Sequence, residues 1–496
     1  MSAAWRYRCF TTLRRVPLPV KLCIRVAKNR RKGSAAPTPG RVVSAGRYLP
    51  HASLPSGTCR ASPAEPYLPP SPVLRFIVGR GLNTLGFQVI SVTIGWLLYE
   101  RTGDPWMLGL VGLVEVIPVV ILLVPSGVVA DRFRRRDVSI GATLIAMVAA
   151  AGLAAAASRP ATAPLWVIYA LLALIGVARA FGQPAFSSYF AELTVPATRA
   201  RMNAWLGAAF ETGAIAGPAI AGGLIAWTGG AVVPLVLATA TQVVFAVLLV
   251  GLPAREPHAE PGTLHHASDL LAGFRFIRRN PVFLAAITLD LLAVLLAGAV
   301  ALLPVYAKDI LQVGPAGLGW LRTAASMGAL LMSIAVTRLP PFQAPGKVLL
   351  WVVAGFGLAT VGFGLSRNFA FSMGCLMLVG ALDMVSVVIR ITLEQNLTPD
   401  PLRGRVSAIN FLFVGFSNEL GAFESGAVAA LIGPVATVVA GGVGAIAVVL
   451  MVAKVWPELA RVGPLHELQP GEGGTEGGGT NNSGTRNSGT NSSGRL

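Results

Sequence analysis

Long apolar segments alternate with short polar loops along most of this chain. Each segment holds about 20 residues with few charges, which is long enough to cross a bilayer core of about 30 Å as a helix. A single segment in lipid must satisfy its own backbone hydrogen bonds, so each is expected to be an α-helix. The pattern predicts an all-α integral membrane fold with twelve spans: 74–98, 106–130, 137–157, 164–189, 203–227, 231–252, 282–306, 316–337, 348–366, 369–393, 406–431 and 434–455.

The basic residues of the loops predict the orientation of the chain. Twelve spans place both termini on one side, and the loops on that side hold fourteen Arg or Lys residues against four on the other side. Because Lys and Arg accumulate in cytoplasmic loops, we expect both termini in the cytoplasm and the chain in a cell (inner or plasma) membrane.

Composition divides the chain further. The longest loop, 253–281, falls midway, so we expect it to be a cytoplasmic linker between six-helix bundles at 73–252 and 282–456. Residues 457–496 end in a tract of Gly, Asn, Ser and Thr and are expected to be a disordered tail. Residues 1–72 are basic and are expected to be disordered too; a transit-like leader and an upstream extension are the open alternatives.

An internal repeat supports two related halves. Seven residues recur with the same identity 204 positions later, which is more than chance readily gives. They are Leu193, Thr194, Arg199, Arg201, Ala204, Gly217 and Gly222.

Charge and cysteine content exclude several classes of function. The net charge of +18 is concentrated in residues 1–72, where 13 bases and one acid supply +12, and aromatic residues do not interleave with the bases, which argues against nucleic-acid binding. The four cysteines form no C-x-x-C pair, so we expect no metal site and no disulfide framework. No nucleotide-binding loop or catalytic set is present, so we expect neither an enzyme nor a cofactor.

The loop after the second span carries a recognisable motif: Gly127, Asp131, Arg132, Arg135 and Arg136. Glycine permits close helix contact, and the arginines favour the cytoplasmic headgroups. The plainer interpretation is a positively charged inner loop. The spacing resembles the signature of the major facilitator superfamily, which implies twelve helices in two pseudo-symmetric bundles, alternating access and a gating role for this loop. The resemblance also implies that Asp131 faces the start of helix 11.

Helix 5 carries a run of small residues around a proline: Gly213, Gly217, Pro218, Gly222 and Gly223. It resembles the helix-5 motif of drug:proton antiporters, except that Ala221 replaces the first glycine of the closing pair. Ordinary close packing of small residues explains the run equally well. The segments 271–281 and 397–408 are similar to the branch of enterobactin-exporter and macrolide-efflux-like proteins, which favours export.

Polar residues at helical spacing form stripes on several spans. Because ionisable groups are costly in lipid, these stripes should face protein or water. The resemblance implies that helices 1, 4, 7 and 10 line a central substrate cavity. The predicted cavity residues are Arg80, Thr84, Gln88, Ser91, Arg179, Gln183, Asp290, Asp383, Ser386 and Arg390.

The repeat places Arg179 and Asp383 at equivalent positions, so they could face each other across the cavity. The alternative is that Asp383 pairs with Arg390 on its own helix, while Arg179 pairs with Glu115 or Glu211 within the first half.

Five acids within the spans are candidates for proton coupling: Asp290, Glu211, Asp383, Glu115 and Glu419. A carboxylate in a low-dielectric interior favours its neutral form and can bind and release a proton as access alternates. A structural ion pair is the alternative for each of them, and Asp290 and Glu211 are the first choices.

Together these observations predict a monomeric secondary active transporter that exports a small amphiphilic molecule, drug-like or siderophore-like, in exchange for protons. The alternatives are an uptake or facilitated-diffusion permease and a transport-inactive membrane sensor or scaffold. The expected partners are the small-molecule substrate, protons and the lipid bilayer.

Overall fold

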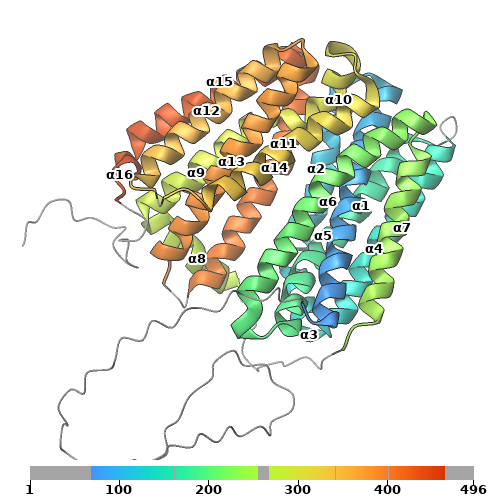
Figure 1. Ribbon diagram of the computed structural model, residues 1–496, viewed down its shortest axis with the longest axis horizontal. Coiled ribbons are helices and arrows are strands. Elements are labelled where there is room, and N and C mark those ends of the chain that lie inside the picture. The colour runs from blue at the N-terminus through green and yellow to red at the C-terminus, as the bar shows by residue number, and fades with distance from the viewer. Residues whose placement is uncertain (1–68, 160–162, 255–266, 341, 400–401, 464–496) are drawn as a thin grey trace, which may run out of the picture. The chain divides into compact units, whose positions relative to one another are not determined.

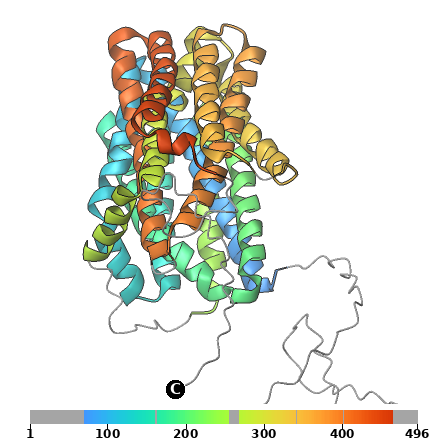
Figure 2. The same ribbon diagram turned by 90° about the vertical axis from the view of Figure 1, so that its left-hand side faces the viewer.

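The computed structural model describes residues 69–159, 163–254, 267–340, 342–399 and 402–463, all within one compact unit, Tyr67–Leu496. The described residues form helices joined by short connections and contain no strand. Most of the two predicted tails, and part of the predicted linker, lie outside the described residues. The long helices run side by side in two groups (Figure 1 and Figure 2).

The first group holds seven helices and one short 3₁₀ turn. They are α1 (Ser71–Thr102), α2 (Pro105–Ile121), α3 (Leu123–Arg132), α4 (Arg135–Ser158), α5 (Leu165–Leu193), η1 (Pro196–Thr198), α6 (Arg199–Thr228) and α7 (Val232–Val250).

The second group begins with a helix of the linker. Its elements are α8 (Ala267–Arg279), α9 (Pro281–Leu296), η2 (Ala299–Leu302), α10 (Leu303–Val305), η3 (Tyr306–Ile310), α11 (Gly314–Val336), α12 (Pro345–Leu365), α13 (Phe369–Leu397), α14 (Arg403–Ile432), α15 (Pro434–Val455) and α16 (Pro457–Ala460).

Local sequence sets where these helices begin and end. The side chains of Asp104, Asn280 and Asn368 accept hydrogen bonds from backbone N–H groups in the first turns of α2, α9 and α13, which satisfies donors that a helix start leaves unpaired. The glycines Gly103 and Gly229 end α1 and α6 with φ values of 63° and 67°, a left-handed conformation that side chains disfavour.

The two groups repeat one packing scheme. In the first, α1 packs on α6 and α7, and α5 packs on α2 and α4. In the second, α9 packs on α14 and α15, and α13 packs on α11 and α12 in the same order. The structure therefore consists of two pseudo-symmetric six-helix bundles.

Apolar side chains both fill the bundles and cover their outside. In the first bundle, Phe76 of α1 lies 5.7 Å from Tyr189 and 6.4 Å from Phe245, measured between ring centroids, and so joins α1, α5 and α7. On the outside, Trp227 and Trp351 are 82% and 78% exposed. Exposed apolar faces of this extent suit lipid rather than water.

The predicted all-helical membrane fold is confirmed. Eleven helical segments of the described chain are long and apolar enough to cross a membrane, and the pair α2–α3, bent by 53°, provides a twelfth span. The predicted spans agree with these helices to within several residues. The predicted disorder of 457–496 is wrong at its start, because α16 packs on α9, α12 and α15 and buries Leu459 completely.

Candidate functional site

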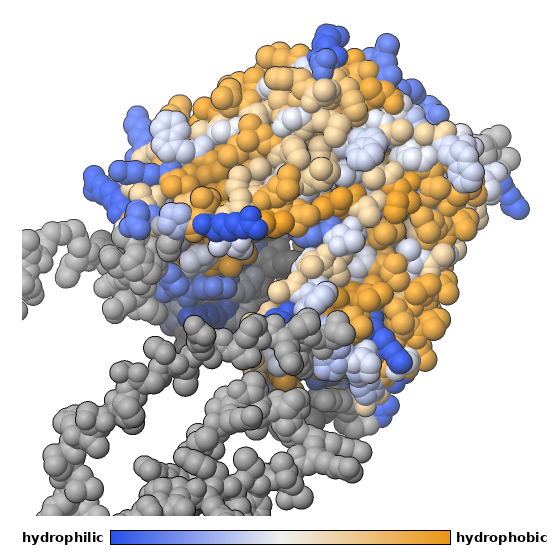
Figure 3. All heavy atoms as spheres, in the orientation of Figure 1, coloured by the Kyte–Doolittle hydropathy of each residue, from blue (hydrophilic) through white to orange (hydrophobic). Residues whose placement is uncertain are grey.

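A cavity of about 650 Å³ lies between the two bundles. We call the side on which α7 ends and α9 begins the linker side, and the opposite side the far side. The cavity is lined by α1 and α6 of the first bundle and by α11 and α13 of the second. Figure 3 shows the hollow between the two groups, with hydrophilic residues on its wall.

Arg80 of α1 is a cationic residue of the cavity wall. Its guanidinium donates to the side-chain oxygen of Asn83 at 2.6 Å and to that of Gln183 at 3.3 Å, and it lies 4.5 Å from the centre of the Phe186 ring. Asn83 in turn donates to Gln242 at 2.8 Å. The arginine is therefore held by neutral groups.

Glu211 of α6 and Thr84 of α1 line the same cavity. Among the described residues, no base forms an ion pair with the Glu211 carboxylate. Phe210, Leu206 and Met384 supply apolar wall between these polar groups. The cavity thus combines isolated charges of both signs with apolar surface, as a site for an amphiphilic molecule requires.

Arg179 of α5 is held by both bundles. Its guanidinium lies 2.7 Å from the carboxylate of Glu115 on α2 and 2.8 Å from that of Glu419 on α14. Arg322 of α11 lies within electrostatic range of both carboxylates. Since Glu419 belongs to the second bundle, this network links the bundles at mid-depth.

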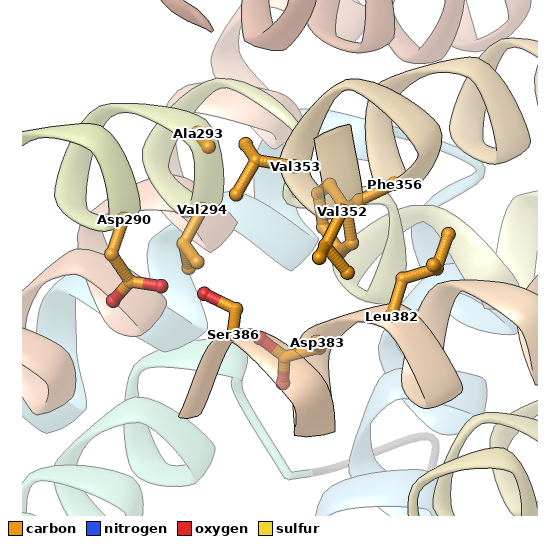
Figure 4. Close-up of a pocket in the computed structure, with 9 residues that line it drawn as sticks. All are labelled: Asp290, Ala293, Val294, Val352, Val353, Phe356, Leu382, Asp383 and Ser386. Carbon is orange, nitrogen blue, oxygen red and sulfur yellow. The ribbon is translucent and has the colours of Figure 1, made fainter. Parts of the chain in front are cut away.

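A second charged group lies inside the C-terminal bundle. Asp290 of α9 forms an ion pair of 2.6 Å with Arg390 of α13, and both side chains are less than a tenth exposed. Arg390 also donates to the Ser386 hydroxyl at 3.3 Å. Figure 4 shows the Asp290 carboxylate and the Ser386 hydroxyl turned toward each other, with Asp383 one turn earlier on α13. They line a cavity of about 10 Å³, which suits roughly one water.

The bundles meet closely on the far side. A Cβ atom added at Gly222 of α6 would lie 2.9 Å from the Cα atom of Gly319 on α11, and Gly426 of α14 meets Gly109 of α2 in the same way. The Tyr99 hydroxyl donates to Asp309, which joins α1 to the end of η3. With these contacts closed, the cavity opens toward the linker side.

The small residues of the fifth span, which is α6, divide between two neighbours. Gly213 and Gly217 pack on α1, where added Cβ atoms would lie 2.7 Å from the Gly81 carbonyl oxygen and 2.6 Å from the Gln88 Cβ atom. Gly222 packs on α11, and the Pro218 carbonyl lies in the same contact, whereas Gly223 has no neighbour within 4 Å of an added Cβ atom.

The loop motif lies at the linker-side end of the first bundle. Arg135 forms an ion pair with Glu192 at 3.0 Å, and Arg136 donates to the Val250 carbonyl at 2.8 Å, so the turn is tied to α5 and α7. Gly127 lies in α3 and Arg132 is exposed. The side chain of Asp131 lies outside what the structure describes.

The structure corrects the predicted lining of the cavity. The predicted cavity residues do not surround one space: Arg80 and Thr84 line the large cavity, Gln183 contacts Arg80, and Asp290, Asp383 and Ser386 line the small one. Gln88 packs against Gly217. Ser91 is partly buried on α1 and does not line either cavity.

Arg179 does not pair with Asp383; it pairs with Glu115, as the alternative held, and also with Glu419. Arg390 forms its ion pair with Asp290 rather than with Asp383. The pairing of Arg179 has a geometric reason: α14 lies against α2 and places Glu419 beside the guanidinium.

Sequence reasoning missed several of the polar groups. Arg322 is a charged residue within an apolar span, and its depth alone could have marked it. Glu394 of α13 continues the polar stripe of Asp383, Ser386 and Arg390, but the stripe did not reveal its partners, Ser407 and Asn410 of α14. No signal in the sequence indicated the contact between Tyr99 and Asp309, since 210 residues separate the two.

Comparison with known proteins places this geometry in context. Residues 76–422 match the family described as Major Facilitator Superfamily. The enterobactin exporter EntS of Shigella boydii serotype 4 (strain Sb227) is 28% identical over 77% of this chain and 91% of its own length. The enterobactin exporter EntS of Escherichia coli O1:K1 / APEC gives the same identity and coverage.

Solved structures share the fold at lower sequence identity. The nucleoside transporter NupG superposes with a TM-score of 0.60 at 13% identity, over 79% of this chain and all of that one. A bacterial homologue of the human lysosomal transporter Spinster, in an inward-facing and unoccupied conformation, gives 0.60 at 13% identity, over 78% of this chain and 98% of that one.

Proposed function

Because the chain belongs to the major facilitator superfamily, we propose that this multi-pass membrane transport protein is a proton-coupled exporter of a small amphiphilic molecule, either drug-like or siderophore-like. The observation that carries the proposal is the cavity of about 650 Å³ between the bundles, open on the linker side and closed on the far side. Similarity to proteins named as enterobactin exporters favours export over uptake.

In this proposal the bundles at 73–252 and 282–456 of a monomer rock against each other in a cell (inner or plasma) membrane. The linker side and both termini are cytoplasmic, as the excess of loop arginines on that side suggests. The loop residues Gly127–Arg136 gate the linker side, where Arg135 and Arg136 fix the turn to the first bundle. Substrate enters from the cytoplasm and leaves after the far-side contacts part.

Proton coupling is assigned first to Glu211 and second to Asp290. Glu211 lines the open cavity and forms no ion pair with any base that the structure describes, so its protonation can change as access alternates. Asp290 is enclosed in an ion pair with Arg390, so a change in its protonation has to break that pair, which places it second. Glu115 and Glu419 share Arg179 and are assigned a structural role in closure.

An efflux assay in a host depleted of its own pumps tests the function. Cells producing the chain should accumulate less of one or more dyes from an amphiphilic panel, and collapse of the proton gradient should remove the difference. Accumulation that increases with the chain would support uptake, and a purified chain that binds dyes but moves none would support a sensor.

Proteoliposomes test the coupling residues. Glu211→Gln should abolish transport driven by a pH gradient while leaving exchange of labelled for unlabelled substrate intact, because exchange needs no net proton movement. Asp290→Asn is the companion variant. Unchanged gradient-driven transport in both would refute the assignment.

A further inference from the structure

The guanidinium of Arg80 is a partly buried cation that has no counter-ion among the described residues. Other arginines of the bundles have carboxylates close by: Arg179 at 2.7 Å, Arg390 at 2.6 Å and Arg135 at 3.0 Å. Arg80 contacts only the amides of Asn83 and Gln183 and the ring of Phe186, and no acid forms an ion pair with it among the described residues.

The position of Arg80 makes this isolation unusual. It is the tenth residue of α1, so its Cα atom lies about 14 Å along the helix from the linker-side end. A charge at that depth is costly unless it faces water or a partner. Arg80 faces the cavity, and two of the five N–H donors of its guanidinium are used by partners in the described part of the chain.

The groups that hold Arg80 also orient it. Asn83 is fixed by its hydrogen bond to Gln242 at 2.8 Å, and Phe186 lies beneath the guanidinium. A planar guanidinium held in this way presents its remaining donors as a fork, which matches the oxygen atoms of a carboxylate or another small oxyanion.

We infer that Arg80 is a subsite for an anionic group of the transported molecule, so that the substrate class is acidic amphiphiles. This inference rests on the proposed function and makes it more specific. The apolar wall formed by Leu206, Phe210, Leu330 and Met384 takes the hydrophobic part of the ligand. Glu211 on α6 is the second charged group that lines the cavity, and it disfavours a second anionic group.

Matched ligands in lipid nanodiscs test the inference with the full chain. The probes are two fluorescent aromatic acids, dansylglycine and 1-naphthylacetate, each compared with its methyl ester, which has nearly the same shape and no charge. We expect at least one acid to bind roughly tenfold or more tightly than its ester, as a charge-assisted hydrogen bond allows.

Four variants locate the effect. Arg80→Gln should remove the preference for the acid, Arg80→Lys should keep only part of it because an ammonium lacks the planar fork, and Gln183→Glu should weaken acid binding by giving Arg80 an internal counter-ion. Arg338→Gln, which removes an exposed arginine on the linker side away from the cavity, should change nothing. Melting temperatures without ligand show that each variant is folded, and Gln183→Glu remains informative if Arg80→Gln does not fold.

The inference is overturned if neither acid binds better than its ester, or if Arg80→Gln keeps the preference. The assay needs no gradient and no direction of transport. A chain that binds acids through Arg80 but moves nothing would therefore refute only the transport proposal. A chain that exports amphiphiles regardless of their charge would refute only this inference.

Discussion

Three arginines at membrane depth are accommodated in three different ways. Arg390 is enclosed with one carboxylate and a hydroxyl, Arg179 is shared by two carboxylates from different bundles, and Arg80 rests on neutral amides and an aromatic ring. A buried ion pair is strongly destabilised when one partner is removed, because the remaining charge stays desolvated. The three residues are therefore expected to respond differently to substitution.

Arg390→Gln should destabilise the chain by about 3–5 kcal/mol, because Asp290 and Asp383 would share a buried site without a base. The double variant Asp290→Asn with Arg390→Gln removes both members of the ion pair and should recover much of the loss. Thermal unfolding in detergent measures both, with Arg338→Gln as the exposed control. A double variant that is no more stable than the single one would contradict the ion-pair explanation.

At the scale of the element, glycines set how closely helices approach. The repeat in the sequence reappears in the packing, since Gly217 and Gly421 bring α6 and α14 against α1 and α9 of their own bundles. Further along the same two helices, Gly222 of α6 packs against α11 and Gly426 of α14 packs against α2, each in the opposite bundle. The same short pattern thus serves packing within each bundle and far-side contact between bundles.

Gly222→Val should open the far side. Its added atoms would overlap the Pro315 carbonyl oxygen, which lies 2.5 Å from an added Cβ atom, and overpacking costs about 1–3 kcal/mol. A cost of that size in one conformation shifts a two-state population about 5- to 150-fold.

Spin labels at Trp227 and Leu431, which are exposed near the far ends of α6 and α14, report the separation in a cysteine-free background. The mean distance should increase. Gly223→Val is the matched control, because nothing lies within 4 Å of an added Cβ atom there. An unchanged distance distribution in Gly222→Val would show that this contact does not limit opening.

At the scale of the whole molecule, contacts between the bundles close the far side, whereas the cavity separates the bundles on the linker side. The Arg179 network lies between these two regions. Among the described residues, it is the ion pair that joins the bundles at mid-depth. Alternating access requires such contacts to break and reform, so their strength should set the balance between conformations.

Glu419→Gln should reduce the fraction of molecules closed on the far side, because it removes the ionic partner that the second bundle gives to Arg179. Glu115→Gln leaves that partner in place and should have the smaller effect on the label distance between Trp227 and Leu431. Equal effects of the two variants would mean that the total charge near Arg179 matters rather than the link between bundles.

The proposed orientation predicts where reporters function. Green fluorescent protein fused at the C-terminus should fluoresce in a bacterial host, whereas alkaline phosphatase fused after Gly229, in the far-side loop between α6 and α7, should be active. The reverse pattern would invert the chain in the membrane and remove the argument for loading from the cytoplasm.

The sequence alone determined the helical membrane fold, the approximate bounds of its spans and the family resemblance. Apolar length and loop punctuation are local properties, and a segment in lipid has no competing backbone structure to adopt. The break at Leu122 and the short helix α16 escaped detection. The break precedes Pro125, which has no N–H to continue the helical hydrogen bonds, whereas α16 depends on packing against neighbouring helices.

Only the tertiary structure decided which charges meet. Helical spacing placed Arg80, Thr84, Gln88 and Ser91 on one face of α1, but Thr84 faces the cavity while Gln88 packs under Gly217. Arg179 contacts Glu419, 240 residues away, because α14 of the second bundle lies against α2 of the first. A helical period fixes the face of a side chain, whereas the identity of the neighbour depends on how whole helices are arranged.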